Sequence, residues 1–439
     1  MTQSDRRVVI TGMGLISPIG SSSTDLWDSL SQHKSGVRLL SNLPTEHFPS
    51  DFGGECTDFT GSIDSFGPLE KKLQRSIKKG LRLMCREIQL GTAAAQLALT
   101  DSGLESGSID PSRIGTLFGS DYIITSPLDF VEGIRACLDA DEKFHFEKWA
   151  EHGLTKVEPL WLLKYLPNMP ASHVAIYNDL RGPSNSITVR EASANLAIAE
   201  ATTIIKRGTA DFMVAGSTGS RIHPLRTVHI ALQEQLADRH TESAGGDPTK
   251  ACRPFDKNRT GMALGEGAGV LILEELSSAE KRGANILGEI VGYGSSCVAD
   301  KNGVANYQKA LKNVLLGGLE TSGLDSSDIG HVHAHGLGSL ECDLQESLAI
   351  AEVMNDTAVT AAKSYMGNLG GGCGIVEIAA SLMALQKGPL FPIINCDDLD
   401  ERCPINAVQT DDVEAGDSFI NLNVTPQGQA SSVVIQKYQ

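Results

Sequence analysis

The sequence predicts an α/β fold, and two observations favour it. Short apolar runs of strand length alternate along the chain with longer segments whose apolar residues recur at helical spacing. Glycine is abundant, with 45 residues, whereas aromatic residues make up only 5%, a composition that suits helices packed closely on sheets. The alternation of strands and helices indicates sheets that are largely buried between helical layers.

The first half of the chain contains five predicted elements, each with its own signal. The run VVI at 8–10 predicts a strand, and the alanine-rich segment 81–99 has the apolar spacing of a helix. The run GTLF at 115–118 predicts a second strand. Residues 194–206 predict a helix with a face of small side chains, and residues 210–215 predict a buried strand after it.

The second half repeats this style. Its predicted strands lie at 268–273, 288–293, 329–334 and 419–424, and its predicted helices lie at 307–319 and 374–385. Both halves open with a strand that runs into a glycine-rich turn, VVITGMG near Val8 and GEIVGYG near Gly288, which indicates a duplicated unit. We therefore predict an N-terminal half at 1–255 and a C-terminal half at 256–439. The segment TESAGGDPT at 241–249 is the strongest loop signal in the chain.

Composition limits the function classes. The chain has 439 residues, and its 37 basic and 54 acidic residues give a net charge of −17, which argues against nucleic acid or an anionic membrane as the main partner. No apolar run approaches the length of a membrane span, and the polar start leads directly into a strand, so we expect neither a span nor a signal peptide. Nine scattered cysteines without a CxxC pair indicate reduced thiols, and we expect a cytoplasmic protein.

Two local motifs suggest chemistry that their details do not support. The turn at 12–18, GMGLISP, imitates a dinucleotide fingerprint, but its third glycine is replaced by Ser17, so a strand-to-helix turn is the simpler interpretation. None of Ser186, Ser193 and Ser339 lies in the GxSxG elbow of a serine hydrolase.

Three histidines, His331, His333 and His335, alternate along a predicted strand and therefore lie on one of its faces. A metal site is one interpretation of this spacing, although the sequence shows no convincing fourth ligand. The alternative is one functional histidine beside two packed ones. We expect no metal and no cofactor.

Five segments spread over nearly the whole chain carry a family resemblance. They are VVITGMGLISPIG (8–20), RGPSNSI (181–187), RPFDKNRTGMALGEGAGVLILEE (253–275), AHGLGSLECD (334–343) and KSYMGNLGGGCGIVE (363–377). Together they resemble the β-ketoacyl-acyl-carrier-protein synthase family, which has the thiolase fold. The resemblance implies two similar halves stacked in five layers, α-β-α-β-α, and a dimer.

The resemblance also implies site residues. The family uses a nucleophilic cysteine at a helix N-terminus, where the dipole lowers the thiol pKa, and two histidines that stabilise an enolate. The cysteine position falls on Glu191, the first histidine on His335, the second on Asn368 and the supporting lysine on Lys363. Glu377 matches the downstream glutamate.

Two further features belong to the expected surroundings of the site. Asp343 closes the AHGLGSLECD segment, and we expect it, like Glu377, to have a structural role behind the catalytic residues. The family's glycine-rich loop with its gatekeeper phenylalanine is TPQGQ here, which places Thr425, Gln427 and Gly428 in that loop without a phenylalanine.

Glu191 changes the expected chemistry. A carboxylate forms no stable acyl thioester, so condensation by the family's route is not expected. An ionised carboxylate at a helix N-terminus would repel a malonyl carboxylate by a few kcal/mol at about 4 Å. Such an anion can pair with protonated His335 or with Lys363, or it can simply cap the helix.

The pattern VREASA around Glu191 resembles the chain-length-factor branch of the family, whose members have lost the cysteine and pair with an active ketosynthase. The leading hypothesis is therefore a non-condensing subunit of a ketosynthase heterodimer in fatty acid or polyketide synthesis. The alternative is a malonyl-carrier decarboxylase or atypical acyltransferase that uses His335, Asn368 and Lys363, in a homodimer. Acyl carrier protein is an expected partner, although carriers are acidic and a chain of charge −17 suits a partner synthase better.

Overall fold

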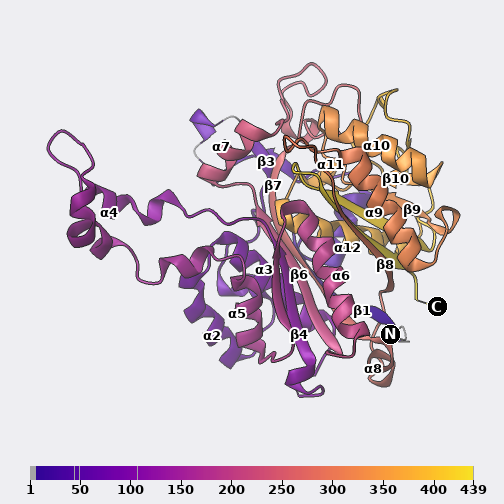
Figure 1. Ribbon diagram of the computed structural model, residues 1–439, viewed down its shortest axis with the longest axis horizontal. Coiled ribbons are helices and arrows are strands. Elements are labelled where there is room, and N and C mark those ends of the chain that lie inside the picture. The colour runs from indigo at the N-terminus through magenta and orange to yellow at the C-terminus, as the bar shows by residue number, and fades with distance from the viewer. Residues whose placement is uncertain (1–5, 44, 49, 106, 439) are drawn as a thin grey trace.

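The computed structural model describes residues 6–43, 45–48, 50–105 and 107–438 of the chain (Figure 1). Its described strands form a mixed sheet of thirteen strands, of which eleven follow one path. Their order is β11 (Asn406–Ala407), β10 (Ala358–Thr360), β9 (His331–His333), β12 (Ser418–Val424), β13 (Gln429–Gln436), β8 (Gly288–Cys297), β1 (Val8–Ile16), β7 (Leu264–Glu275), β6 (Phe212–Ser220), β4 (Ile114–Ser120) and β5 (Ser184–Thr188). The short strands β2 (Val37–Leu39) and β3 (Phe52–Gly54) join through β7.

The sheet has two parts, one made of β1, β7, β6, β4 and β5 and the other made of β8, β13, β12, β9, β10 and β11. Two residue pairs between β1 and β8 connect them. Helices α6 (Ser193–Lys206) and α12 (Cys373–Lys387) pack between the parts and contact strands of both, as Figure 1 shows at its centre. Helices α3 (Arg86–Asp101) and α5 (Met169–Asn178) cover the outer face of the β1–β4 part. Helix α9 (Tyr307–Ser322) covers the β8–β13 part, with α10 (Leu340–Met354) packed on α9. The α/β class and the five-layer, thiolase-like arrangement are therefore confirmed.

Six further helices complete the described chain. They are α1 (Ser23–Ser31), α2 (Lys71–Gly80), α4 (Val131–Arg135), α7 (Pro224–Gln233), α8 (Leu276–Lys281) and α11 (Lys363–Met366). Among the described residues, no helix has both the length and the apolar character needed to cross a membrane. The predicted division of the chain into an N-terminal half at 1–255 and a C-terminal half at 256–439 stays a prediction.

The predicted glycine-rich turns are not turns. Gly12 and Gly14 lie inside β1, whose nine residues are all buried, and Gly292 and Gly294 lie inside β8. A Cβ on Gly14 would lie 2.2 Å from a carbonyl oxygen of α3, and a Cβ on Gly292 would lie 2.5 Å from a carbonyl oxygen of α9. Glycine is thus needed because a helix crosses each strand at close range, and the same arrangement in both halves agrees with a duplicated unit.

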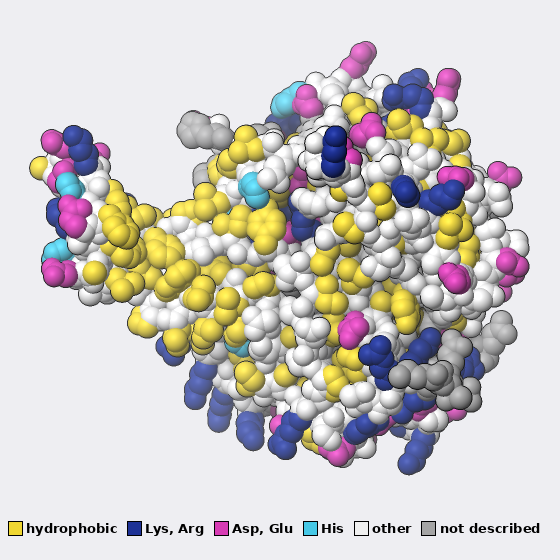
Figure 2. Space-filling view, in the orientation of Figure 1, with side chains coloured by type: hydrophobic (Ala, Val, Ile, Leu, Met, Phe, Trp, Pro, Cys, Tyr) yellow, Lys and Arg dark blue, Asp and Glu magenta, His cyan; other side chains and the backbone are white. Residues whose placement is uncertain are grey.

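One segment leaves the layered body. The residues between β4 and α5 form an arm that carries α4 and projects to the left in Figure 1. Figure 2 shows hydrophobic side chains gathered over the base of this arm. The arm exposes several large apolar side chains, including Leu128 at 78% and Phe146 at 75% exposure.

Candidate functional site

A cavity of about 550 Å³ marks the candidate site. Glu191 and His335, which are far apart in sequence, both line it, together with Glu234, Cys342 and Thr425. The cavity therefore brings together residues from both halves of the chain.

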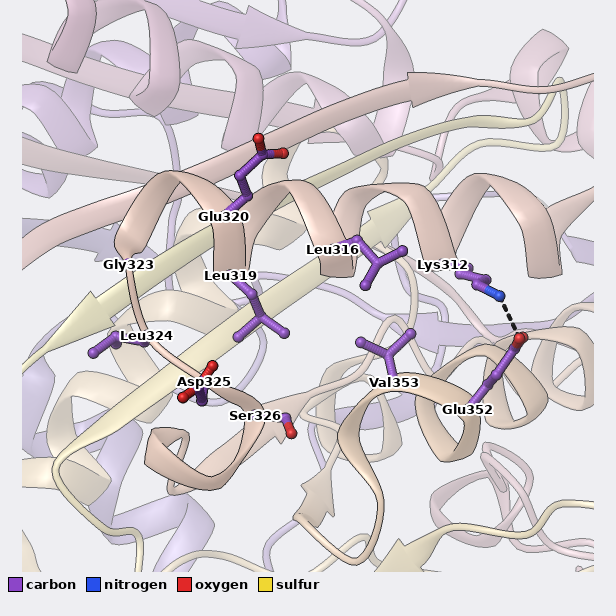
Figure 3. Close-up of a pocket in the computed structure, with 10 residues that line it drawn as sticks. All are labelled: Lys312, Leu316, Leu319, Glu320, Gly323, Leu324, Asp325, Ser326, Glu352 and Val353. Atoms are coloured by element: carbon purple, nitrogen blue, oxygen red, sulfur yellow. Dashed lines mark hydrogen bonds and ion pairs between the residues drawn. The ribbon is translucent and has the colours of Figure 1, made fainter.

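A larger cavity, of about 710 Å³, lies elsewhere, between α9 and the end of α10 (Figure 3). Its apolar lining includes Leu316 and Val353, and Lys312 and Glu352 form an ion pair at its edge. It contains none of the predicted site residues, so we do not assign the function to it.

Glu191 lies where β5 is followed by a single helical turn, Arg190–Ala192, and then by α6. Arg190 has a φ of +50°, a left-handed conformation that is uncommon for a residue with a side chain. The turn is anchored by Ser193, whose Oγ accepts from the Val189 N–H at 2.8 Å and donates to the Ser120 carbonyl at 2.8 Å. This local structure places the side chains of residues 190 and 191 together in the buried interior.

The carboxylate of Glu191 is bound by three side chains. Arg221 donates to its Oε1, and the Asn368 amide donates to the same oxygen at 3.1 Å. The Arg190 Nε lies 3.5 Å from Oε2. Glu191 is only 1% exposed and the Arg221 side chain is fully buried, so this is an ion pair within the protein core.

Two more acids complete the cluster. Glu234 accepts from Arg190, and its Oε1 lies 3.3 Å from Arg221 Nη1. Asp121 Oδ2 lies 3.7 Å from Arg221 Nη2. Three buried carboxylates therefore surround two buried guanidinium groups, and we call these five residues the charge cluster.

The charge cluster keeps Glu191 ionised. Burial raises the pKa of its carboxyl group, but the positive charges of Arg221 and Arg190 outweigh burial and hold the pKa at about 2. The expectation of an ionised side chain agrees with this value, whereas the expected partners, Lys363 and protonated His335, are wrong. The helix-cap interpretation is also wrong, because side chains rather than the first turn of α6 bind this carboxylate.

Lys363 forms an ion pair with an acidic residue other than Glu191. It donates to Glu377 on α12, and both side chains are buried. The second oxygen of Glu377 accepts from Asn423 at 2.8 Å, so this pair is complete without Glu191. Glu377, matched to the downstream glutamate of the family, therefore lies next to Lys363.

His335 is neutral. Burial and the nearby charge of Lys363 lower its pKa well below the ordinary value. Lys363 Nζ lies 3.3 Å from Nδ1 and can only donate, so the ring proton is on Nε2. The Nε2–H has no hydrogen-bond partner among the described residues, and His335 lines the cavity. This N–H can therefore donate a hydrogen bond to a ligand in the cavity.

Asn368 has little donor capacity left for a ligand. Its Oδ1 accepts from the Gly370 N–H at 3.0 Å and from the Cys373 thiol at 3.3 Å, which fixes the orientation of the amide. Its Nδ2 then points to Glu191, and also lies 3.3 Å from the sulfur of Met262. One of the two donors that the resemblance predicts for an enolate is thus already engaged by Glu191.

Asp343 binds the backbone of the loop that follows His335. Its carboxylate accepts from the backbone N–H groups of Phe255, Leu337 and Gly338 at 2.9 to 3.1 Å. Burial raises its pKa to about 6. Glu346, which the sequence did not single out, accepts from the N–H of His335 at 2.6 Å and from that of Gly336 at 2.8 Å.

The predicted gatekeeper loop forms the turn between β12 and β13. Thr425 is buried and lines the cavity, whereas Gln427 is exposed and does not line it. Gly428 has a φ of +82° and donates its N–H to the Thr425 carbonyl at 2.9 Å. Only Thr425 of the three predicted loop residues therefore reaches the site.

No activated thiol replaces the missing nucleophile at this site within the described residues. Cys342 lines the cavity, but burial and the charge of Glu346 raise the pKa of its thiol well above the ordinary value. Burial also raises the pKa of Cys373, to about 12. Both thiols are therefore protonated at neutral pH, and a protonated thiol is a poor nucleophile. All nine cysteines are free thiols, as predicted.

The other two histidines of the HVHAH segment are packing residues. His331 contacts the Ala415 carbonyl at 2.8 Å and Ser381 at 2.9 Å. His333 contacts Ser381 at 2.8 Å and accepts from the Ala362 N–H at 3.1 Å. Their ring nitrogens are therefore occupied by protein groups, which favours the interpretation of one functional histidine beside two packed ones.

Sequence reasoning missed Arg221 and Glu234. Arg221 follows directly after the nine buried residues of β6, and an arginine at the end of a buried strand is a signal that could have been used. Glu234 follows the end of α7 and carries no comparable signal.

The layered fold and the placement of these residues define a thiolase-like protein, and comparisons with known proteins identify its family. Residues 5–279 match the family model described as beta-ketoacyl synthase, N-terminal domain, and residues 287–397 match the corresponding C-terminal domain. The chain belongs to the beta-ketoacyl synthase family.

Individual relatives support this family assignment. A 3-oxoacyl-[acyl-carrier-protein] synthase 2 from Vibrio cholerae is 32% identical over 419 residues, which cover 92% of each chain. The corresponding protein from Synechocystis is 30% identical over 408 residues, covering 92% of this chain and 91% of its own. The crystal structure of a beta-ketoacyl synthase from Burkholderia phymatum has a TM-score of 0.83 at 27% identity and covers 99% of this chain and all of its own. The ishigamide ketosynthase/chain length factor, at 24% identity and a TM-score of 0.82 over 99% of this chain and all of its own, shows the same fold.

Proposed function

We propose that this chain is a non-condensing, chain-length-factor-like subunit that pairs with an active ketosynthase in fatty acid or polyketide synthesis. The observation that carries this proposal is the ionised, fully buried Glu191 at the position where the family resemblance expects a nucleophilic cysteine. A carboxylate held by Arg221 and Asn368 is neither free to attack an acyl thioester nor able to form a stable one.

The exposed apolar surface supports a partner subunit. Leu128, Phe146 and Leu160 on the arm, and Ile176 and Leu232 beside it, are all at least 60% exposed. Exposed apolar side chains that gather at one place, as Figure 2 shows at the base of the arm, are typical of a protein interface. The edge of the sheet supports the same proposal, because β5 pairs with β4 alone among the described strands and leaves its other edge open.

The basic side chains of α2 favour the carrier as a further partner. Lys71, Lys72, Arg75 and Lys79 line one side of this helix, and Figure 2 shows basic side chains gathered at the lower left of the view, in the region of α2. An acidic carrier protein needs such a surface. The net charge of −17 therefore does not exclude carrier docking, because the cations are concentrated locally.

The partner proposal is tested by isolating the tagged protein from its own cells and identifying what remains bound in stoichiometric amount. We expect a ketosynthase with an intact active-site cysteine. Leu128→Asp on the arm should release it, whereas Leu316→Asp, at an exposed leucine in the cavity of Figure 3, should not. A stable homodimer that an added ketosynthase does not displace would refute the proposal.

The second candidate function is malonyl-carrier decarboxylation, which one observation favours. His335 and Lys363 are intact, and the His335 Nε2–H is available to the cavity. Against it, the Asn368 amide is engaged by Glu191, and the charge of Glu191 opposes a second carboxylate. Carbon dioxide release from malonyl-carrier tests this candidate, and equal rates for the wild-type protein and for His335→Ala would count against it.

A further inference from the structure

Three side chains from different parts of the chain converge on the Glu191 carboxylate: Arg221 and Asn368 donate hydrogen bonds to it, and Arg190 forms a longer ion pair with it. Arg190 is its sequence neighbour, Arg221 follows β6, and Asn368 lies between α11 and α12. Two guanidinium groups and an amide are the groups that proteins use to bind carboxylates. Each is fixed independently of Glu191: Arg190 and Arg221 also bind Glu234, and the Asn368 amide is oriented by Gly370.

From this arrangement we propose that Arg190, Arg221 and Asn368 form a carboxylate-binding site that the chain's own Glu191 occupies. The site borders the 550 Å³ cavity, because Glu191 is one of the residues that line that cavity. In the wild-type protein the site is filled from within, so an external carboxylate cannot bind there. When the side chain at residue 191 is shortened, the site accepts a small monocarboxylate that enters through the cavity.

Electrostatics support this assignment. Glu234 and Asp121 balance the two arginines, yet the Glu191 carboxyl group, which is completely buried, still has a pKa of about 2. The attraction of the Glu191 carboxylate to the two arginines therefore outweighs both the cost of burying its charge and its repulsion by the two other acids. The same balance allows the two arginines to stay buried when Glu191 is removed, because each keeps an acidic neighbour.

The backbone gives an independent indication that the arrangement is specific. Arg190 adopts a left-handed conformation at φ +50°, which costs a residue other than glycine on the order of 1 kcal/mol. Residues 190 and 191 both belong to the buried charge cluster that follows from this turn.

The test replaces the missing side chain with a free ligand. Glu191→Ala removes one methylene group and the carboxylate, and acetate supplies a methyl group and a carboxylate. With sodium acetate at 100 mM, we expect the thermal midpoint of Glu191→Ala to rise by about 2 °C relative to sodium chloride at equal ionic strength. Acetamide and methylammonium should give no rise, because the first lacks the charge and the second has the opposite charge.

Three controls make the result specific. The wild-type protein should not respond to acetate, because its site is occupied. The variant Glu320→Ala, at an exposed glutamate in the cavity of Figure 3, should not respond either. The double variant Glu191→Ala with Arg221→Met removes a donor of the site and should lose the response.

If Glu191→Ala does not fold in chloride, refolding in acetate gives the same information, and recovery in acetate but not in chloride supports the site. A response to acetate that equals the response to chloride, in either form of the experiment, overturns the inference. The inference concerns binding alone and does not depend on the partner proposed above. A failed acetate experiment beside a successful isolation of a ketosynthase would therefore reject only the carboxylate-binding site.

Discussion

Neutralising Glu191 should weaken the fold by an amount that the structure sets. Glu191→Gln keeps the size of the side chain and removes its charge. The pKa of the carboxyl group is lowered from an ordinary 4.5 to about 2, and each pKa unit corresponds to 1.36 kcal/mol. We therefore expect a loss of about 3 kcal/mol in the free energy of unfolding at pH 7, close to the cost of breaking a buried ion pair.

The pH dependence of this loss has a definite sign. Because the folded-state pKa is depressed, the stabilisation is fully present above pH 4.5 and is lost as the pH falls toward 2. The difference between the wild-type protein and Glu191→Gln should thus stay constant from pH 5 to 8 and shrink in acid. Denaturant unfolding at several pH values measures it, with Glu320→Gln as the exposed control.

Two results would refute this reasoning. The first is a Glu191→Gln variant as stable as the wild-type protein at pH 7, which would mean that the charge cluster contributes nothing at residue 191. The second is a difference that changes between pH 5 and 8, which would assign the effect to another titrating group. A double-mutant cycle with Arg221→Met should show strong coupling, because the two buried side chains are in direct contact.

The remaining predictions concern the nucleophile, the loop that follows His335 and the carrier. Glu191→Cys should place a thiol of lowered pKa at residue 191, because Arg221 and Arg190 favour its thiolate. Mass spectrometry should then detect its alkylation by iodoacetamide at pH 7, and an unreactive thiol would contradict the positive field of the two arginines. Burial raises the pKa of Glu346 to about 8, so between about pH 4.5 and 8 this residue loses its proton in the unfolded chain but keeps it in the folded one. The thermal stability of the wild-type protein should therefore decline over this pH range, and Glu346→Gln should remove that decline. An unchanged decline would assign it to another group. Reversing charge at Lys72 and Arg75 on α2 should weaken carrier binding severalfold at low salt and little at high salt, and equal binding at both salt concentrations would exclude this surface.

The fold was largely predictable from the sequence. The strands at 115–118 and 419–424 and the helix at 194–206 have local apolar patterns that agree with β4, β12 and α6. The glycines of β1 and β8 were placed in turns because glycine is a turn residue in most contexts. Their true reason, a helix crossing the strand at close range, depends on packing between segments far apart in the chain.

For the candidate site, the sequence predicted which residues belong to it but not which of them interact. The family resemblance located four site residues, Glu191, His335, Asn368 and Lys363. In the structure Glu191 and His335 line one cavity, Asn368 contacts Glu191, and Lys363 contacts His335. Which of them pair could not be read from the sequence, because an ion pair depends on distance in space. Lys363 is a buried cation like Arg221, yet it donates to Glu377 on the adjoining helix α12 and not to Glu191.

The sequence by itself determined the family, the α/β class and the replacement of a nucleophilic cysteine by a glutamate. The sequence also predicted an ionised carboxylate, but for another reason, the favourable position of an anion next to a helix N-terminus. Only the tertiary structure decided what holds that charge: β6 ends beside the turn before α6, so Arg221 reaches Glu191 across 30 residues of sequence. The physical reason is that buried charge needs a counter-ion, and the fold, not the local sequence, supplies it.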